Sequence, residues 1–269
     1  MFLNIDKQNR ESVALVDNDG RRVTYGELAD RMGELGARVE PRSVIFNLCR
    51  NTAGAMAGYL GFIDRGAVPL NLSDKIDRAL LQTMLDTYRP AWLWVPEEEA
   101  AGFGGEVVCR LWDYALVRTG NPLYPLHEDL QFLMATSGST GSPKLVRYKK
   151  GNLEANAKNV AIAFGWTQAE RPLCDLGMQY TMGLNVINTH LFVGATVLLT
   201  TYNIMSAGFW QYMKEERATN FTGVPFSYDL FYRLRFERMD LPDLKTLSQG
   251  GGKLTSARFT QLANYAART

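Results

Sequence analysis

The sequence predicts an α/β fold with two parallel-rich, helix-flanked sheets, and three observations support this. Short apolar strands alternate with helical patterns of about 10–15 residues, which is typical of βαβ units and a largely parallel sheet. The alternation is interrupted between Gly102 and Pro125 and resumes beyond Asn152. With 269 residues, the chain can hold one large or two ordinary domains and bury a sizeable core.

The first predicted element is a β-hairpin. Its two strands, Val13–Val16 and Arg21–Thr24, flank a turn in which Gly20 can adopt a positive φ. Thr24 and Glu27 then have the spacing of a capping box, in which a hydroxyl and a carboxylate satisfy free backbone amides. We therefore expect a helix to begin directly after this hairpin.

Strands and helices then alternate through the first half of the chain. The predicted elements are a strand over 44–49, a helix over 53–63, a strand over 67–72, a helix capped by Ser73 and running to about Tyr88, and a strand over 91–95. The segment from Gly102 to Pro125 is rich in Gly and Pro and less regular. We place a sub-domain junction there and divide the chain into residues 1–125 and 126–269.

The second half continues the pattern. The predicted strands are 173–176, 195–200, 220–224 and 244–248, with helical patterns between them. Capping signals support these helices, with N-caps at Asn152, Ser206 and Ser256 and a first-turn proline at Pro225.

Charge and composition exclude several classes of protein. The 29 basic and 28 acidic residues give a formal net charge of +1, which provides no electrostatic footprint for nucleic acid or an anionic membrane. The N-terminus has no secretory-signal pattern, and there is no uninterrupted apolar run of about 18 residues. The three cysteines are far apart in sequence and are interpreted as buried thiols. We expect a reduced, cytoplasmic, soluble protein without nucleic-acid or membrane partners.

Histidines give no metal-site signal. The sequence contains two of them, His127 and His190, and no metal-ligand spacing accompanies either. We interpret His127 as a surface residue and His190 as a core residue, so no metal ligands are predicted.

The strongest chemical signal follows an apolar strand that begins at Leu130. It is a run of hydroxyl residues interleaved with glycine, followed by Pro-Lys: Thr136, Ser137, Gly138, Ser139, Thr140, Gly141, Ser142, Pro143 and Lys144. Glycines let backbone amides turn inward to form an anion-binding concavity, and the hydroxyls add donors. Lys144 supplies a full positive charge for the outer phosphates of a nucleotide.

This segment does not fit the Walker A spacing. The alternative is a flexible Ser/Gly surface loop, but the preceding strand and the Pro-Lys ending favour a phosphate site. Because Ser137–Pro143 has little apolar surface to bury, we expect it to be poorly ordered without nucleotide.

At these residues the chain resembles the adenylate-forming superfamily, which includes acyl-CoA synthetases, luciferases and adenylation domains of nonribosomal peptide synthetases. The family signature, [ST]-S-G-[ST]-T-G-x-P-K, is matched at every defined position, although Leu145 stands where Gly is usual. Further segments resemble the family in the right order along nearly the whole chain: Val23–Leu28, Leu60–Leu72, Gly177–Leu184, Gly194–Ala195 and Gln249–Leu254.

The resemblance implies a reaction in which ATP, with Mg²⁺, converts a carboxylic acid into an acyl adenylate and pyrophosphate. A thiol of coenzyme A or of an acyl or peptidyl carrier protein would then accept the acyl group. The nucleotide-binding residues would be Thr136, Ser137, Gly138, Ser139, Thr140, Gly141, Ser142 and Lys144, with Lys144 and Thr140 catalytic. The acid-binding residues would be Tyr180, Gly183, Gly250, Gly251 and Gly252.

Some of these residues also have a simpler interpretation. Tyr180 could be an ordinary core residue with its hydroxyl satisfied, and the triplet Gly250–Gly252 could be only a tight turn. The family's Y-G-x-T-E segment and its C-terminal domain would lie beyond this sequence. We therefore expect an N-terminal portion that is inactive alone. Two other classes remain open: a nucleotide-binding homologue without turnover, and an unrelated phosphotransferase that releases ADP.

Overall fold

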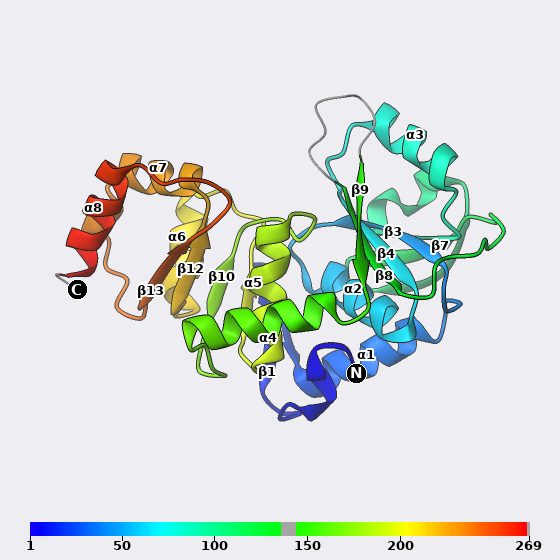
Figure 1. Cartoon of the computed structure of the whole chain (residues 1–269), viewed down its shortest axis with the longest axis horizontal. Coiled ribbons are helices and arrows are strands. Elements are labelled where there is room, and N and C mark those ends of the chain that lie inside the picture. The colour runs from blue at the N-terminus through cyan, green and yellow to red at the C-terminus, as the bar shows by residue number, and fades with distance from the viewer. Residues whose placement is uncertain (136–143, 268–269) are drawn as a thin grey trace.

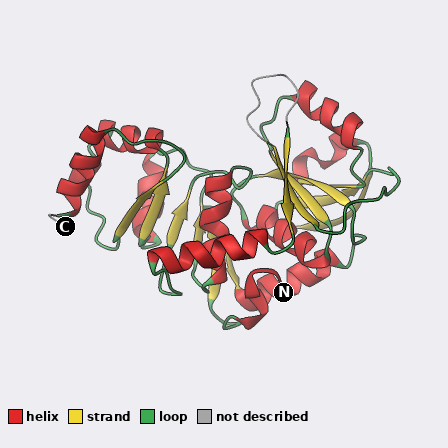
Figure 2. Ribbon diagram, in the orientation of Figure 1, coloured by secondary structure: helices red, strands yellow, loops and turns green. Residues whose placement is uncertain are grey.

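The computed structural model describes residues 1–135 and 144–267 and confirms the α/β fold. Two mixed sheets lie side by side, with helices between and around them (Figures 1 and 2). We call them the β3 sheet, with strand order β6-β7-β5-β3-β4-β8-β9, and the β10 sheet, with strand order β13-β12-β10-β11-β1-β2.

The β3 sheet has a parallel centre and antiparallel edges. Its strands are β3 (Val44–Cys49), β4 (Val68–Ser73), β5 (Trp92–Pro96), β6 (Glu106–Leu111), β7 (Tyr114–Arg118), β8 (Leu130–Ala135) and β9 (Leu145–Lys149). The pairs β5–β3, β3–β4 and β4–β8 are parallel, whereas β6, β7 and β9 join antiparallel. The parallel strands therefore end at one common edge.

The β10 sheet is parallel except for its first hairpin. Its strands are β1 (Val13–Asp17), β2 (Arg22–Thr24), β10 (Pro172–Cys174), β11 (Val197–Leu199), β12 (Asn220–Gly223) and β13 (Thr246–Gln249). The predicted hairpin is confirmed as the antiparallel pair β1–β2, with Gly20 at φ 87° in its turn. Strand β1 then pairs in parallel with β11, which is remote in sequence.

The helices cover both sheets. They are α1 (Tyr25–Gly36), α2 (Ala53–Arg65), α3 (Arg78–Tyr88), α4 (Asn152–Phe164), α5 (Thr181–Phe192), α6 (Ala207–Glu215), α7 (Pro225–Arg233) and α8 (Ser256–Ala266). Three 3₁₀ segments complete the described elements: η1 (Phe2–Lys7), η2 (Glu97–Phe103) and η3 (Phe236–Arg238).

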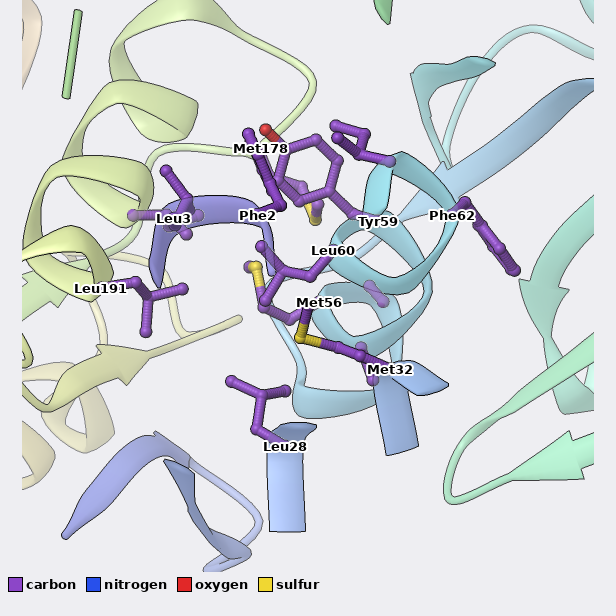
Figure 3. Close-up of a cluster of buried hydrophobic side chains, with 14 of the residues drawn as sticks. Phe2, Leu3, Leu28, Met32, Met56, Tyr59, Leu60, Phe62, Met178 and Leu191 are labelled. Atoms are coloured by element: carbon purple, nitrogen blue, oxygen red, sulfur yellow. The ribbon is translucent and has the colours of Figure 1, made fainter. Parts of the chain in front are cut away.

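The largest hydrophobic core lies between the sheets. Helix α2 is buried from Ala53 through Ile63, because it packs between the β3 sheet and the helices of the other sheet. Figure 3 shows part of this core, in which Phe2 and Met178 lie beside Tyr59 of α2. The rings of Phe2 and Tyr59 meet edge to face at a centroid distance of 6.0 Å. This shared core fixes the two sheets against each other.

The sheets do not divide the chain at residue 125. Strands β8 and β9, which follow this point, complete the β3 sheet, and the first hairpin belongs to the β10 sheet. The segment between Gly102 and Pro125, expected to be irregular, contains β6 and β7. These short apolar runs pair antiparallel with each other, and β7 also pairs antiparallel with β5, despite the flanking glycines.

Three of the predicted helix caps are displaced. Helix α3 begins at Arg78 and not after Ser73, because Asp77 accepts the Leu80 amide while Ser73 closes a local turn. Helix α8 is capped by Thr255, one residue before the predicted Ser256. Asn152 lies inside α4, and its side chain accepts from Lys149 N.

Other predicted helix starts are confirmed. The hydroxyls of Thr24 and Ser206 accept from the amides of Glu27 and Phe209, as an N-cap side chain does. Pro225 occupies the first turn of α7.

Candidate functional site

The signature segment lies at the carboxyl edge of the parallel strands. Strand β8 ends at Ala135 and β9 begins at Leu145, and β8 runs parallel to β4. In open α/β sheets, ligands bind outside the carboxyl ends of such strands. Lys144 is exposed and directly precedes β9.

The predicted phosphate-loop residues fall between the two described ranges of the chain. Thr136, Ser137, Gly138, Ser139, Thr140, Gly141 and Ser142 lie outside the described residues. The expectation that Ser137–Pro143 is poorly ordered without nucleotide concerns the same segment and stays a prediction.

Tyr180 stands at the N-terminus of α5, on the connection from β10. Its side chain is 59% exposed, so it is not the core residue that the simpler interpretation required. The backbone fixes its place: Tyr180 N donates to Gly177 O, and Leu184 N donates to Tyr180 O. The aromatic ring is therefore presented at the surface from an ordered helix start.

The glycine triplet after β13 lies against two helix starts. A β-carbon on Gly250 would fall 2.4 Å from Cε of Met182, in the first turn of α5. Gly251 has φ +76°, and a β-carbon there would lie 3.2 Å from Val224, just before α7. The triplet thus combines a positive-φ turn with close packing, and it lies beside the helix that carries Tyr180.

Gly183 has a packing reason to be glycine. A β-carbon there would lie 2.3 Å from the carbonyl oxygen of Leu176 and 2.4 Å from that of Gly177. The residue is buried inside the first turn of α5. Its direct contact with an acid, predicted from the sequence, stays a prediction.

The acid segment, defined here as residues 177–183, contacts the strand that leads into the signature. Thr181 Oγ1 lies 3.4 Å from Sδ of Met134, near the end of β8. Asn71 Nδ2, on the neighbouring strand β4, donates to Met178 O at 3.3 Å. The structure therefore brings together Tyr180, Gly183 and the glycine triplet, and places the end of β8 beside Thr181 of the acid segment.

Asp175 is a residue that the sequence analysis did not single out. It directly follows β10, and its Oδ1 is buried without a hydrogen-bond partner among the described residues. Burial raises the pKa of this carboxyl group to about 6. The only sequence signal was an acidic residue at the end of an apolar strand.

Residues 1–135 and 144–267 contain neither a cluster of metal ligands nor a membrane-spanning helix. This part of the chain holds no group of three or more His, Cys, Asp or Glu side chains placed to bind a metal ion. It also holds no helix that is long and apolar enough to cross a membrane.

Comparison with known protein families decides the class of the chain. Residues 3–268 match the family described as AMP-binding enzyme. The chain belongs to this family. The match covers nearly the whole sequence and includes the signature and the acid segment, so the resemblance identified from the motifs is confirmed.

Curated relatives of this AMP-binding chain are larger proteins. An isonitrile lipopeptide synthase from Streptomyces coeruleorubidus is 27% identical over 247 residues, covering 87% of this chain and 16% of the relative. A feruloyl-CoA synthase from Amycolatopsis sp is 28% identical over 257 residues, covering 88% of this chain and 50% of the relative. The chain thus spans half or less of the length of these relatives.

Solved structures share the fold of the AMP-binding chain. VinN in complex with L-aspartate has a TM-score of 0.79 at 18% identity, covering 98% of this chain and 73% of VinN. The o-succinylbenzoate CoA synthetase from Bacillus subtilis, in complex with an acyl-adenylate intermediate, also has a TM-score of 0.79 at 18% identity. That match covers 98% of this chain and 56% of the synthetase. At these identities the likeness shows the fold alone.

Proposed function

We propose that the protein containing this chain is an AMP-forming carboxylic-acid ligase. It activates an acid with ATP to give acyl-AMP and pyrophosphate. One observation carries the proposal beyond family membership: the acid segment is in contact with the β8 strand that leads into the signature, through Thr181 and Met134. A carboxylate bound at the acid segment and a phosphate chain bound by the signature after β8 would then be neighbours.

The chain's own residues would mainly position the reactants and stabilise charge. Adenylation needs the acid carboxylate in line with the α-phosphate and a neutralised pyrophosphate leaving group. We assign the second task to Lys144 and Thr140, with the hydroxyls and glycines from Thr136 to Ser142 holding ATP. Tyr180, Gly183 and the glycine triplet would border the acid. We propose that Mg²⁺ accompanies ATP, where it would neutralise part of the charge on the phosphates.

The second half-reaction would transfer the acyl group to a thiol. The names of the relatives support this, since one is a feruloyl-CoA synthase and another is tyrocidine synthase 3 from Brevibacillus parabrevis. We propose coenzyme A or a carrier-protein thiol as the acceptor. We also propose a cytoplasmic location without nucleic-acid or membrane partners, which the near-neutral charge balance supports.

Acid-dependent ATP–pyrophosphate exchange tests the proposed function. The longer protein that contains this chain should incorporate labelled pyrophosphate into ATP with at least one member of a panel of aliphatic, aromatic and amino acids. Product analysis should find AMP and not ADP. Nucleotide binding without exchange for any acid would favour a homologue without turnover, and ADP release would indicate a phosphotransferase.

We further propose that the 269-residue chain is inactive alone. The relatives that it matches are at least twice as long as the matched part. When catalytic groups act as a unit, the effects of removing them are strongly non-additive, so loss of some of them removes most of the activity. The 269-residue chain should therefore give no exchange with the panel that supports exchange by the longer protein. Robust exchange by the short chain would place the complete active site within these residues.

A further inference from the structure

A row of three buried residues crosses the centre of the β3 sheet. Asn47 of β3 is in register with Asn71 of β4, which is in register with Met134 of β8. Asn47 Nδ2 donates to Asn71 Oδ1 at 3.1 Å, so the Asn71 amide is held with its nitrogen available for another acceptor. All three side chains are almost fully buried.

This row contacts the acid segment at two points. Asn71 Nδ2 donates to Met178 O at 3.3 Å, and Met134 Sδ accepts from Thr181 Oγ1 at 3.4 Å. The Met178 side chain is itself fixed, because it is fully buried in the inter-sheet core beside Tyr59 (Figure 3). The acid segment is therefore attached to the β3 sheet, although it leaves from a strand of the β10 sheet.

A third asparagine extends this attachment toward β10. Asn51 follows β3, and its Nδ2 lies 3.1 Å from both Cys174 O and Leu176 O. Together with Asn71, it holds the backbone oxygens of residues 174, 176 and 178. Such buried carbonyls need partners, and here the partners come from the opposite sheet.

We propose that Asn71 and Met134 are positioning residues that set the distance between the acid and the phosphate chain of ATP. The inference rests on the proposed function. The two residues are cross-strand neighbours, one of them lies just before the signature, and both contact the acid segment. Loss of either contact would shift the acid segment relative to β8 without removing any of the proposed binding residues.

Adenylation is sensitive to such a shift. The reaction needs the carboxylate oxygen in line with the α-phosphate, and a misplacement of about 1 Å can cost about 100-fold in rate. In the proposed function, ATP is bound by the signature and not by the acid segment. Loss of the positioning contacts should therefore lower kcat while leaving the KM for ATP nearly unchanged.

The test uses substitutions that remove the polar or sulfur atom and leave an apolar side chain of similar reach. Met134→Leu removes the sulfur acceptor, Asn71→Leu removes the amide donor, and Thr181→Val removes the hydroxyl donor. Two buried residues elsewhere serve as matched controls. Met56→Leu changes a fully buried methionine of α2, and Asn188→Leu removes a buried amide that bonds Tyr59 at 3.0 Å.

In the longer protein, Met134→Leu and Asn71→Leu should each lower kcat for pyrophosphate exchange by about 10- to 100-fold. The KM for ATP should change less than about twofold. In a Thr181→Val background, Met134→Leu should have no additional effect, since the contact is already lost. The inference is wrong if both variants match the two controls. The absence of exchange by the wild-type protein would instead contradict the proposed function.

Hydrogen exchange tests the attachment independently of activity. In the folded 269-residue chain, Asn71→Leu should accelerate amide exchange in residues 177–184 by about fivefold, with no acceleration in α2. Met56→Leu should leave residues 177–184 unchanged. Equal protection of this segment in wild type and Asn71→Leu would show that Asn71 does not hold it.

Discussion

Gly183 and Leu176 are in contact where α5 begins: a β-carbon on the glycine would lie 2.3 Å from the carbonyl oxygen of the leucine. That carbonyl cannot easily move away, because it accepts from Asn51 Nδ2 at 3.1 Å. The first turn of α5 is therefore pressed against a backbone segment held from the other sheet. Glycine at position 183 makes this approach possible.

Gly183→Ala should destabilise the fold by about 1–3 kcal/mol, the usual cost of overpacking. Urea unfolding followed by circular dichroism measures the change. Gly33→Ala is the matched control, because Gly33 lies within α1 and a β-carbon there meets nothing within 4 Å. It should stabilise the fold by about 0.5–1 kcal/mol. Equal effects of the two substitutions would contradict the packing role of Gly183.

The sequence was sufficient to predict elements whose signals are local. The hairpin at residues 13–24 and the strands of the parallel centre depend on short apolar runs and turn residues, and the structure confirms them. The acid segment was singled out because its glycines and Tyr180 fit a family pattern, and its role in acid binding stays a prediction. These features follow from neighbouring residues alone.

Features that depend on distant pairing could not be predicted. Strand β1 joins β11, although residue 15 pairs with residue 197, and no local pattern encodes such a register. Strands β6 and β7 were missed because Gly and Pro dominate the composition around them. Contacts of Asn51 and Asn71 with the acid segment cross between sheets, so they emerge only from the tertiary structure.

Lys144→Ala should lower kcat for adenylation by about 10²- to 10³-fold, the usual scale for one preorganised contact to developing charge. Thermal unfolding should change little, since Lys144 is exposed. Lys150→Ala is the control, because it removes an exposed lysine of the same hairpin without changing the signature. The kcat of both variants is measured by pyrophosphate exchange in the longer protein. An unchanged kcat for Lys144→Ala would remove this residue from the mechanism.

Tyr180→Ala should raise the KM for the acid more than the KM for ATP, because the exposed ring belongs to the acid segment. Substrate titrations in the exchange assay separate the two constants. Tyr124→Ala provides a comparison, since Tyr124 is 39% exposed and bonds Tyr88 O, away from the acid segment. Equal increases in both KM values for Tyr180→Ala would exclude a selective role in acid binding.

His190 is buried in a site that favours its neutral ring. Its Nδ1 donates to Val186 O at 2.8 Å, and Asn220 Nδ2 donates to its Nε2 at 3.3 Å. Trp166 covers the ring at a centroid distance of 4.2 Å. Burial is the main cause that lowers the pKa of His190 to about 4, while Glu170 and the Val186 carbonyl oppose the shift.

The lowered pKa of His190 predicts a loss of stability in acid. Because the neutral ring is favoured in the folded state, this stabilisation is complete above pH 6.5 and is lost as the pH falls toward 4. The free energy of unfolding should fall by on the order of 3 kcal/mol across this window from His190 alone.

Urea unfolding at closely spaced pH values should show a shallower fall for His190→Gln than for wild type. His127→Gln is the matched control, because the ring of His127 is exposed, and it should retain the wild-type slope. Carboxylates also titrate below pH 6.5, so the difference between the two variants isolates the contribution of His190. If both variants follow the wild-type curve, His190 is not the group responsible for this part of the acid sensitivity.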